Sequence, residues 1–161
     1  MTREEFIKIL EKSRYSYREE GDRIIITSGN SESKGDIRFG FWKDIPPNLE
    51  FRNSRHVLVD SLTKIPDGTI FRNGGHVYLT ELKELDGKVE FRNVGDVYFN
   101  SLSSISPGPE FHNRFTTLRP LLLNSGDSRD FDDWEGNIEG IDSNELLNKM
   151  ISNGIFNKKK R

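Results

Sequence analysis

The chain has 161 residues, with 24 Lys and Arg, 26 Asp and Glu, three His and no Cys, and its formal net charge is −2. This length is typical of one domain, and the lack of cysteine excludes disulfide frameworks and thiolate zinc sites. The balanced charge argues against nucleic-acid binding through bulk charge. Because the first residues are charged and no long apolar span exists, we expect a cytoplasmic protein without a membrane segment.

The first predicted element is a helix from Thr2 to about Arg14. Thr2 and Glu5 have the spacing of a capping box. Three apolar residues recur at helical spacing on one face: Phe6, Ile9 and Leu10. The run of isoleucines at 24–26 then predicts a strand that pairs with the first coil of the segment that follows. Residues 1–34 are therefore interpreted as an N-terminal cap of helix and strand.

A repeat of twenty residues dominates residues 35–122. The triplet Phe-Arg-Asn begins at Phe51, Phe71 and Phe91, and Phe-His-Asn begins at Phe111. Apolar columns keep the same spacing: Val57, Val77 and Val97; Val59, Leu79 and Phe99; Leu62, Leu82 and Leu102; Ile65, Leu85 and Ile105. The same columns, traced back by one unit, meet Ile37, Phe39, Trp42 and Ile45. The repeat therefore starts near Gly35.

Each repeat unit predicts two short strands that alternate apolar and polar residues, such as 49–51 and 57–59. The segment from Ile65 to Gly68 has turn chemistry, with Pro66 fixing φ and Gly68 allowing positive φ. A unit of this size cannot bury its own apolar face, so the units must stack and share one core. We therefore predict a mainly β fold, a short β-solenoid or leucine-rich-repeat-like rod of four to five coils. Its handedness, and whether the far side of each coil is helical or extended, stay open.

The repeat weakens after Phe111. A constant spacing of twenty puts Thr117 and Arg119 in columns that are apolar elsewhere. Residues 123–161 are expected to form an acidic loop, a C-terminal helical cap and a basic tail. The helix is predicted from Asp142 as N-cap, Glu145 at its third position and Gly154 at its C-cap. The segments 1–34, 35–122 and 123–161 are expected to form a single domain.

The repeat unit resembles the short-repeat, leucine-rich-like solenoid proteins of bacteria and phages, whose units read FxNGGxVYLxSLTxLPxG. The match is almost position by position from Phe71 to Leu79, which read FRNGGHVYL. Residues 15–22 and 134–151 also resemble the first and last segments of these proteins. The resemblance implies a solenoid fold over nearly the whole chain, without an assigned activity.

The outward positions of the second strand are the strongest candidate binding site. Three columns are expected to point away from the core: His56, His76 and Asp96; Leu58, Tyr78 and Tyr98; Asp60, Thr80 and Asn100. Aromatic residues flanked by polar groups are typical of protein-binding surfaces. The alternative is cross-strand aromatic stacking that only stabilises the sheet. The sequence favours a non-enzymatic protein-binding module. Given the resemblance, one version is a phage or bacterial modulator or inhibitor of a host or defence protein.

A second candidate is a stripe of cations that could bind nucleic acid: Arg52, Arg72, Arg92, Lys158, Lys159, Lys160 and Arg161. Glutamates two residues before most of these arginines lie on the same strand face, so we favour a ladder of ion pairs. Arg72 is the exception, because Ile70 occupies the position of its glutamate. The sequence therefore keeps nucleic-acid binding as the alternative function.

Other chemistry has weaker support. Asn53, Asn73, Asn93 and Asn113 form a column that we interpret as a buried ladder satisfying the backbone of a turn, rather than as a ligand site. His56, His76 and Asp96 could in principle share a metal, but no ligand motif supports this set. No catalytic motif is present, although a glycan-cleaving enzyme is a third possibility. We therefore expect no cofactor, no metal and no membrane partner, and leave the oligomeric state open.

Overall fold

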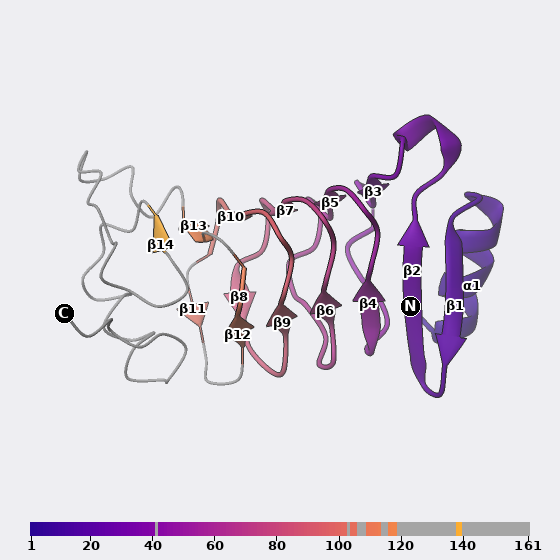
Figure 1. The fold of residues 1–161 in the computed structure, drawn as a ribbon. Coiled ribbons are helices and arrows are strands. Elements are labelled where there is room, and N and C mark those ends of the chain that lie inside the picture. The colour runs from indigo at the N-terminus through magenta and orange to yellow at the C-terminus, as the bar shows by residue number, and fades with distance from the viewer. Residues whose placement is uncertain (41, 103, 106–108, 114–115, 119–137, 140–161) are drawn as a thin grey trace.

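The computed structural model describes residues 1–40, 42–102, 104–105, 109–113, 116–118 and 138–139. Over these residues the chain is mainly β, with one helix at the N-terminus followed by a β-solenoid of about three turns. Figure 1 shows the coils following one another along one axis, with the helix at one end. The predicted solenoid and N-terminal helix are confirmed. The expected C-terminal helix lies outside the described residues.

Three sheets form the sides of the solenoid. Sheet A contains, in spatial order, β1 (Ser16–Glu20), β2 (Arg23–Ser28), β4 (Leu49–Phe51), β6 (Ile70–Phe71), β9 (Glu90–Phe91) and β12 (Glu110–Phe111). Sheet B contains β3 (Ile37–Arg38), β5 (Val57–Leu58), β7 (Val77–Leu79), β10 (Val97–Phe99), β13 (Thr116–Leu118) and β14 (Ile138–Glu139). Sheet C pairs β8 (Glu84–Leu85) with β11 (Ser104–Ile105), so this third side is extended rather than helical.

Strands of successive coils pair in parallel and in register, which places like residues on top of one another. Val57 pairs with Val77 and Val77 with Val97 in sheet B. In sheet A the buried rings of Phe51, Phe71 and Phe91 stack with centroids 5.0 and 5.1 Å apart. This spacing follows the separation of about 4.8 Å between hydrogen-bonded strands. The twenty-residue spacing thus creates a continuous core that no single coil could form.

A buried ladder of asparagines fixes the corner between sheets A and B. The Asn73 Nδ2 atom donates to the carbonyl of Arg55 on the preceding coil (3.0 Å) and to that of His76 on its own coil (3.1 Å). Asn53 makes the equivalent pair of bonds. Each amide therefore ties one coil to the coil before it. The predicted structural role of this column is confirmed.

The N-terminal helix covers the open end of the core. Helix α1 (Arg3–Lys12) begins with the predicted capping box, in which Thr2 and Glu5 each bond to the other's backbone N–H. Its buried Phe6 ring packs edge-on against Phe39 and Trp42 of the first coil, with centroids 5.8 and 5.5 Å away. The β1–β2 hairpin adds Ile24, Ile25 and Ile26 beside β4, as expected. Without this cover the first coil would expose apolar side chains and a strand edge.

The register at β13 corrects one expectation from the constant spacing. Thr116 pairs with Val97 and Leu118 with Phe99, so the coil from β10 to β13 is one residue shorter than the twenty-residue coils that join β3, β5, β7 and β10. Thr117 is therefore in register with Tyr98 rather than with Val97. The expectation that Thr117 falls in an apolar column is wrong, because a one-residue slip exchanges the two faces of a strand. Arg119 lies outside the described residues.

The described part of the chain also lacks any helix with the length and apolar character needed to cross a membrane.

Replacing Asn73 with aspartate should destabilise the solenoid strongly. The change removes two donated hydrogen bonds and places a carboxylate against two carbonyl oxygens in a buried corner. We expect a loss of about 3–5 kcal/mol in the free energy of unfolding, measured by urea denaturation. The exposed Asn100→Asp variant is the matched control, with an expected change within about 0.5 kcal/mol. Similar values for the two variants would contradict the role of the asparagine ladder.

Candidate functional site

The outward side of β3, β5, β7 and β10 gathers the predicted binding residues on one surface, here called the sheet B face. It consists of three adjacent columns, each with one residue per coil. The histidine column contains Asp36, His56, His76 and Asp96; the tyrosine column contains Arg38, Leu58, Tyr78 and Tyr98; the polar column contains Gly40, Asp60, Thr80 and Asn100. All eight residues predicted as protein-binding therefore lie together.

The histidine column is a chain of side-chain to backbone hydrogen bonds. The Asp36 Oδ1 atom accepts from the backbone N–H of His56 (3.2 Å), and the His56 Nδ1 atom accepts from that of His76 (2.9 Å). The His76 Nδ1 atom accepts in turn from the N–H of Asp96 (2.8 Å). The two imidazole rings stack in parallel with centroids 5.1 Å apart. With Nδ1 as acceptor, the neutral form of each ring carries its proton on Nε2.

The stacked imidazoles require glycine at the next corner of the solenoid. A Cβ atom on Gly75 would lie 2.5 Å from the His56 Nδ1 atom. One on Gly95 would lie 2.6 Å from the His76 Nδ1 atom and 2.8 Å from the backbone carbonyl carbon of Gly75. Neither glycine has a positive φ, so space rather than backbone conformation explains them. Arg55 occupies the same column as these glycines, one coil after Asp36. Asp36 is smaller than histidine and leaves room for the Arg55 side chain. The glycine column is thus linked to the histidine column.

The tyrosine column has an aromatic centre that is half-buried. Tyr78 and Tyr98 stack with centroids 4.9 Å apart and planes 7° apart. The Tyr78 ring also meets His56 and His76 edge-on, and the Tyr98 hydroxyl donates to Asp96 Oδ2 (3.2 Å). Stacking covers the ring faces between the two coils, and both side chains stay partly exposed. The column therefore stabilises the sheet and also presents amphipathic edges of the kind found in interfaces.

The polar column borders these rings, and its residues differ in exposure. The Thr80 hydroxyl donates to Asp60 Oδ1 (3.1 Å), whereas Asn100 is exposed. Asp96 differs from the expectation of an outward, accessible residue, because it is only 8% exposed beside His76 and Tyr98. Within the described residues it is the last member of the histidine column, and its backbone N–H donates to the His76 Nδ1 atom.

Burial changes the acid–base behaviour of this face. Partial burial lowers the pKa of His56 below its ordinary value of 6.5; Asp36 opposes this shift, while His76, Arg55 and Arg38 add to it. Burial also raises the pKa of the Tyr78 hydroxyl, assisted by Asp96, Asp36 and Asp60. Both shifts favour the uncharged form, so the His56 ring and the Tyr78 hydroxyl are neutral at pH 7.

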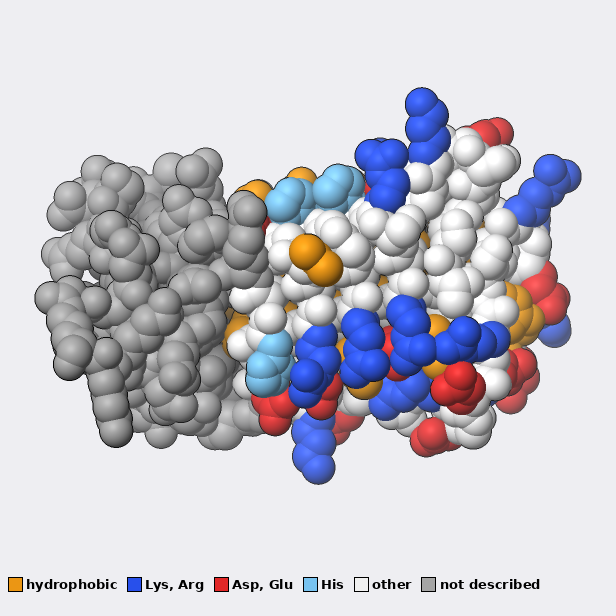
Figure 2. All heavy atoms as spheres, in the orientation of Figure 1, with side chains coloured by type: hydrophobic (Ala, Val, Ile, Leu, Met, Phe, Trp, Pro, Cys, Tyr) orange, Lys and Arg blue, Asp and Glu red, His pale blue; other side chains and the backbone are white. Residues whose placement is uncertain are grey.

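The predicted arginine stripe lies on the outward side of sheet A, where Figure 2 shows basic side chains in a row with acidic ones beside them. Arg52 Nη2 lies 2.5 Å from Glu50 Oε1, and Arg92 Nε lies 2.8 Å from Glu90 Oε2. Arg72 follows Ile70 instead of a glutamate, and its Nε atom lies 3.8 Å from Glu50 Oε1 of the preceding coil. This geometry is an ion-pair ladder. The tail residues Lys158, Lys159, Lys160 and Arg161 lie outside the described residues.

The set of His56, His76 and Asp96 is arranged for hydrogen bonding rather than for holding a metal. Both Nδ1 atoms already accept backbone N–H groups. In the described ranges, no cluster of three or more His, Cys, Asp or Glu side chains could hold a metal ion.

One group of residues beside the predicted face was not expected from the sequence. Asp36 is buried and contacts both Arg38 Nη2 (3.2 Å) and Arg55 Nε (3.5 Å). The only sequence signal was the match of Gly35-Asp36-Ile37 with Gly95-Asp96-Val97, which indicated the repeat and no chemistry. The arginines come from different coils, so their convergence required the register of β3 and β5.

A methyl group at Gly75 should test the coupling between the glycine and histidine columns. Gly75→Ala should cost about 1–3 kcal/mol in the free energy of unfolding, because the new Cβ overlaps the His56 ring. In a His56→Asp background the cost of Gly75→Ala should fall by at least about 0.5 kcal/mol. The reason is that Asp36 stands one coil before Arg55, as His56 stands before Gly75, and leaves room for the Arg55 Cβ atom. Urea denaturation of the four proteins of this cycle measures the coupling. Gly40→Ala, which meets nothing within 4 Å, is the control, and an equal cost at both glycines would refute the overlap.

Acidification should weaken the histidine column. The folded pKa of His56 is lower than the unfolded value of 6.5, so its contribution is complete above pH 6.5 and is lost as pH falls through the folded pKa. We expect His56→Asn, whose amide oxygen can accept the same N–H, to lose less stability than the wild type between pH 7 and pH 5. Urea midpoints at several pH values measure this difference. His112→Asn on sheet A is the control, and the prediction fails if both variants follow the same pH profile.

Comparison with known proteins found no match to a family model, a curated protein or a solved structure. Function is therefore inferred from the side chains that the solenoid brings together on its surface.

Proposed function

We propose that the chain is a non-enzymatic binding module that recognises another protein through the sheet B face. The observation that carries this proposal is the half-buried Leu58, Tyr78 and Tyr98 column between two polar columns on paired strands. Aromatic and apolar residues surrounded by a polar rim are the usual composition of an interface centre. Ring stacking and the histidine column hold this surface in one conformation, so binding would cost little conformational entropy.

Nucleic-acid binding is the weaker alternative. In the described residues, the arginines of sheet A lie against glutamates, and Glu50 serves both Arg52 and Arg72. A phosphate backbone would have to displace these carboxylates or bind beside them. The sheet B face has neutral rings at its centre and needs no such displacement. The protein-binding proposal therefore has the better support.

Several finer features belong to the same proposal. We propose that the solenoid has four to five coils and ends in the C-terminal helical cap expected at 142–154. The likeness to the short-repeat solenoid proteins of bacteria and phages supports a role as a modulator or inhibitor of a host or defence protein. We retain the cytoplasm as its compartment.

An arginine at Asn100 should block binding without disturbing the fold. Asn100 is exposed at the rim of the sheet B face, so a long charged side chain there obstructs a partner while leaving the core intact. We expect proteins captured by the tagged chain from a lysate of its native cell to decrease at least tenfold with Asn100→Arg. Quantitative mass spectrometry after nuclease treatment measures the capture.

The matched control is Glu84→Arg, which adds an arginine at an exposed position of sheet C. It should capture the same proteins as the wild type. A second variant, Tyr78→Ser with Tyr98→Ser, should abolish capture, provided that circular dichroism shows a folded protein. Proteins that remain bound to every variant would refute the site, and prey lost only with nuclease would favour the arginine stripe.

A further inference from the structure

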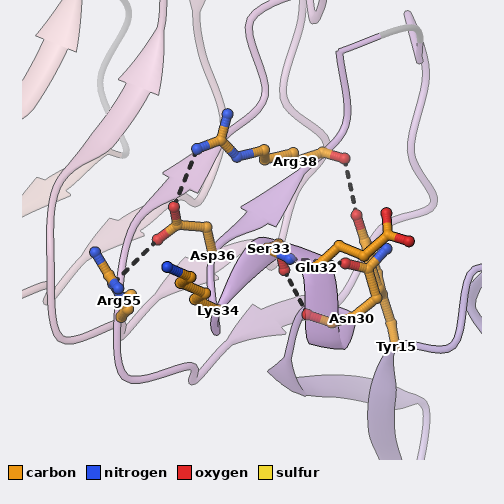
Figure 3. A pocket seen from close by; sticks show the side chains of 8 residues that line it. All are labelled: Tyr15, Asn30, Glu32, Ser33, Lys34, Asp36, Arg38 and Arg55. Carbon is orange, nitrogen blue, oxygen red and sulfur yellow. Dashed lines mark hydrogen bonds and ion pairs between the residues drawn. The ribbon is translucent and has the colours of Figure 1, made fainter.

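A cleft of about 590 Å³ opens at the N-terminal end of the sheet B face, where β3 meets the preceding turn. Its lining is polar and charged, and Figure 3 shows the side chains that form it: Tyr15, Asn30, Glu32, Ser33, Lys34, Asp36, Arg38 and Arg55. Three cations and two carboxylates are present, which leaves one net positive charge. Glu32 extends toward Tyr15 in this view, away from Arg55. The positive charge is therefore concentrated around Asp36.

Asp36 positions the two guanidinium groups. It is 6% exposed, and its carboxylate contacts Arg38 Nη2 and Arg55 Nε, while Oδ1 also accepts the backbone N–H of His56. The arginine side chains themselves are 61% and 49% exposed. Each guanidinium has five N–H donors, and Asp36 engages only one side of each. The remaining donors stay available in the cleft, held by a buried anchor.

This cleft is continuous with the proposed binding face. Arg38 is in register with Leu58, which is in register with Tyr78, so the tyrosine column begins with a cation and continues with apolar and aromatic residues. Two arginines that share one carboxylate anchor suit the planar, two-oxygen geometry of a second carboxylate. The complementary surface has a negative charge at one end and apolar side chains along the rest.

We propose that Lys34, Arg38 and Arg55 form a carboxylate-binding subsite, and that the partner is a protein segment with an acidic residue followed by apolar ones. This inference rests on the protein-binding role proposed above. Successive coils are about 4.8 Å apart, and an extended segment places every second side chain about 6.8 Å further along. A segment lying along the solenoid axis would therefore place its acidic residue at Arg38 and its second and fourth following residues over Leu58 to Tyr98. The recognised pattern is acidic-x-apolar-x-apolar.

A random dodecapeptide phage library panned against the full chain tests this pattern. With the wild type we expect the acidic-x-apolar-x-apolar pattern to be at least fivefold more frequent in the selected peptides than in the unselected library. In this pattern Asp or Glu stands two and four residues before apolar side chains. With Arg38→Glu the acidic preference should disappear and Lys or Arg should replace it, because the subsite charge is reversed. Lys64→Glu makes the same charge change at an exposed lysine outside the sheet B face and should leave the acidic preference unchanged.

The outcomes separate this inference from the proposed function. Apolar enrichment without acidic enrichment would overturn the carboxylate subsite and leave the protein-binding face in place. The role of the sheet B face in binding would be overturned by two results together. The wild type would select no apolar residues, and the acidic enrichment would persist in the Tyr78→Ser, Tyr98→Ser double variant. No enrichment with the wild type would overturn both. Should Arg38→Glu unfold the chain, Arg38→Gln keeps a neutral donor at the same position and should lose the acidic preference without gaining a basic one.

Discussion

In-register stacking of the coils is the constraint on which the rest of the structure depends. Each side chain of the repeat lies about 5 Å from its counterpart on the next coil, as the stacked rings of Phe51, Phe71 and Phe91 show. A residue therefore stabilises the solenoid only if it packs well against the residue at the same position of the next coil, which is often of the same type. Phenylalanine satisfies this condition in the core by stacking, and asparagine satisfies it at the corner by bonding to two coils.

The same constraint determines the surface. Ion pairs on sheet A form along the column as well as within a coil, so Glu50 neutralises Arg72 across the coil boundary. On sheet B, the rings of His56 and His76 stack in parallel, and burial favours the uncharged form of His56, which reduces repulsion along the column. The surface chemistry of this fold is thus set by residues at equivalent positions of successive coils. A candidate binding site lies where the residue type changes along such a column.

Stacking also carries a cost. Within the described residues no donor reaches the buried Oδ1 atoms of Asn53, Asn73 and Asn93. A buried acceptor without a partner costs about 1–3 kcal/mol. Each of these amides offsets that cost by donating to carbonyls of two coils. The ladder thus stabilises the corner by linking each coil to the one before it.

The sequence by itself determined the solenoid, its repeat boundaries near Gly35, the capping box of α1 and the three columns of the sheet B face. These features follow from local spacing, because a period of twenty and an alternation of two specify which residues stack and which face outward. Only the tertiary structure decided the one-residue shift at β13, the burial of Asp96 and the convergence of Arg38 and Arg55 on Asp36. Each depends on how one coil sits on the next, and that relation is fixed by backbone pairing and side-chain volume at the corners, which spacing alone does not encode.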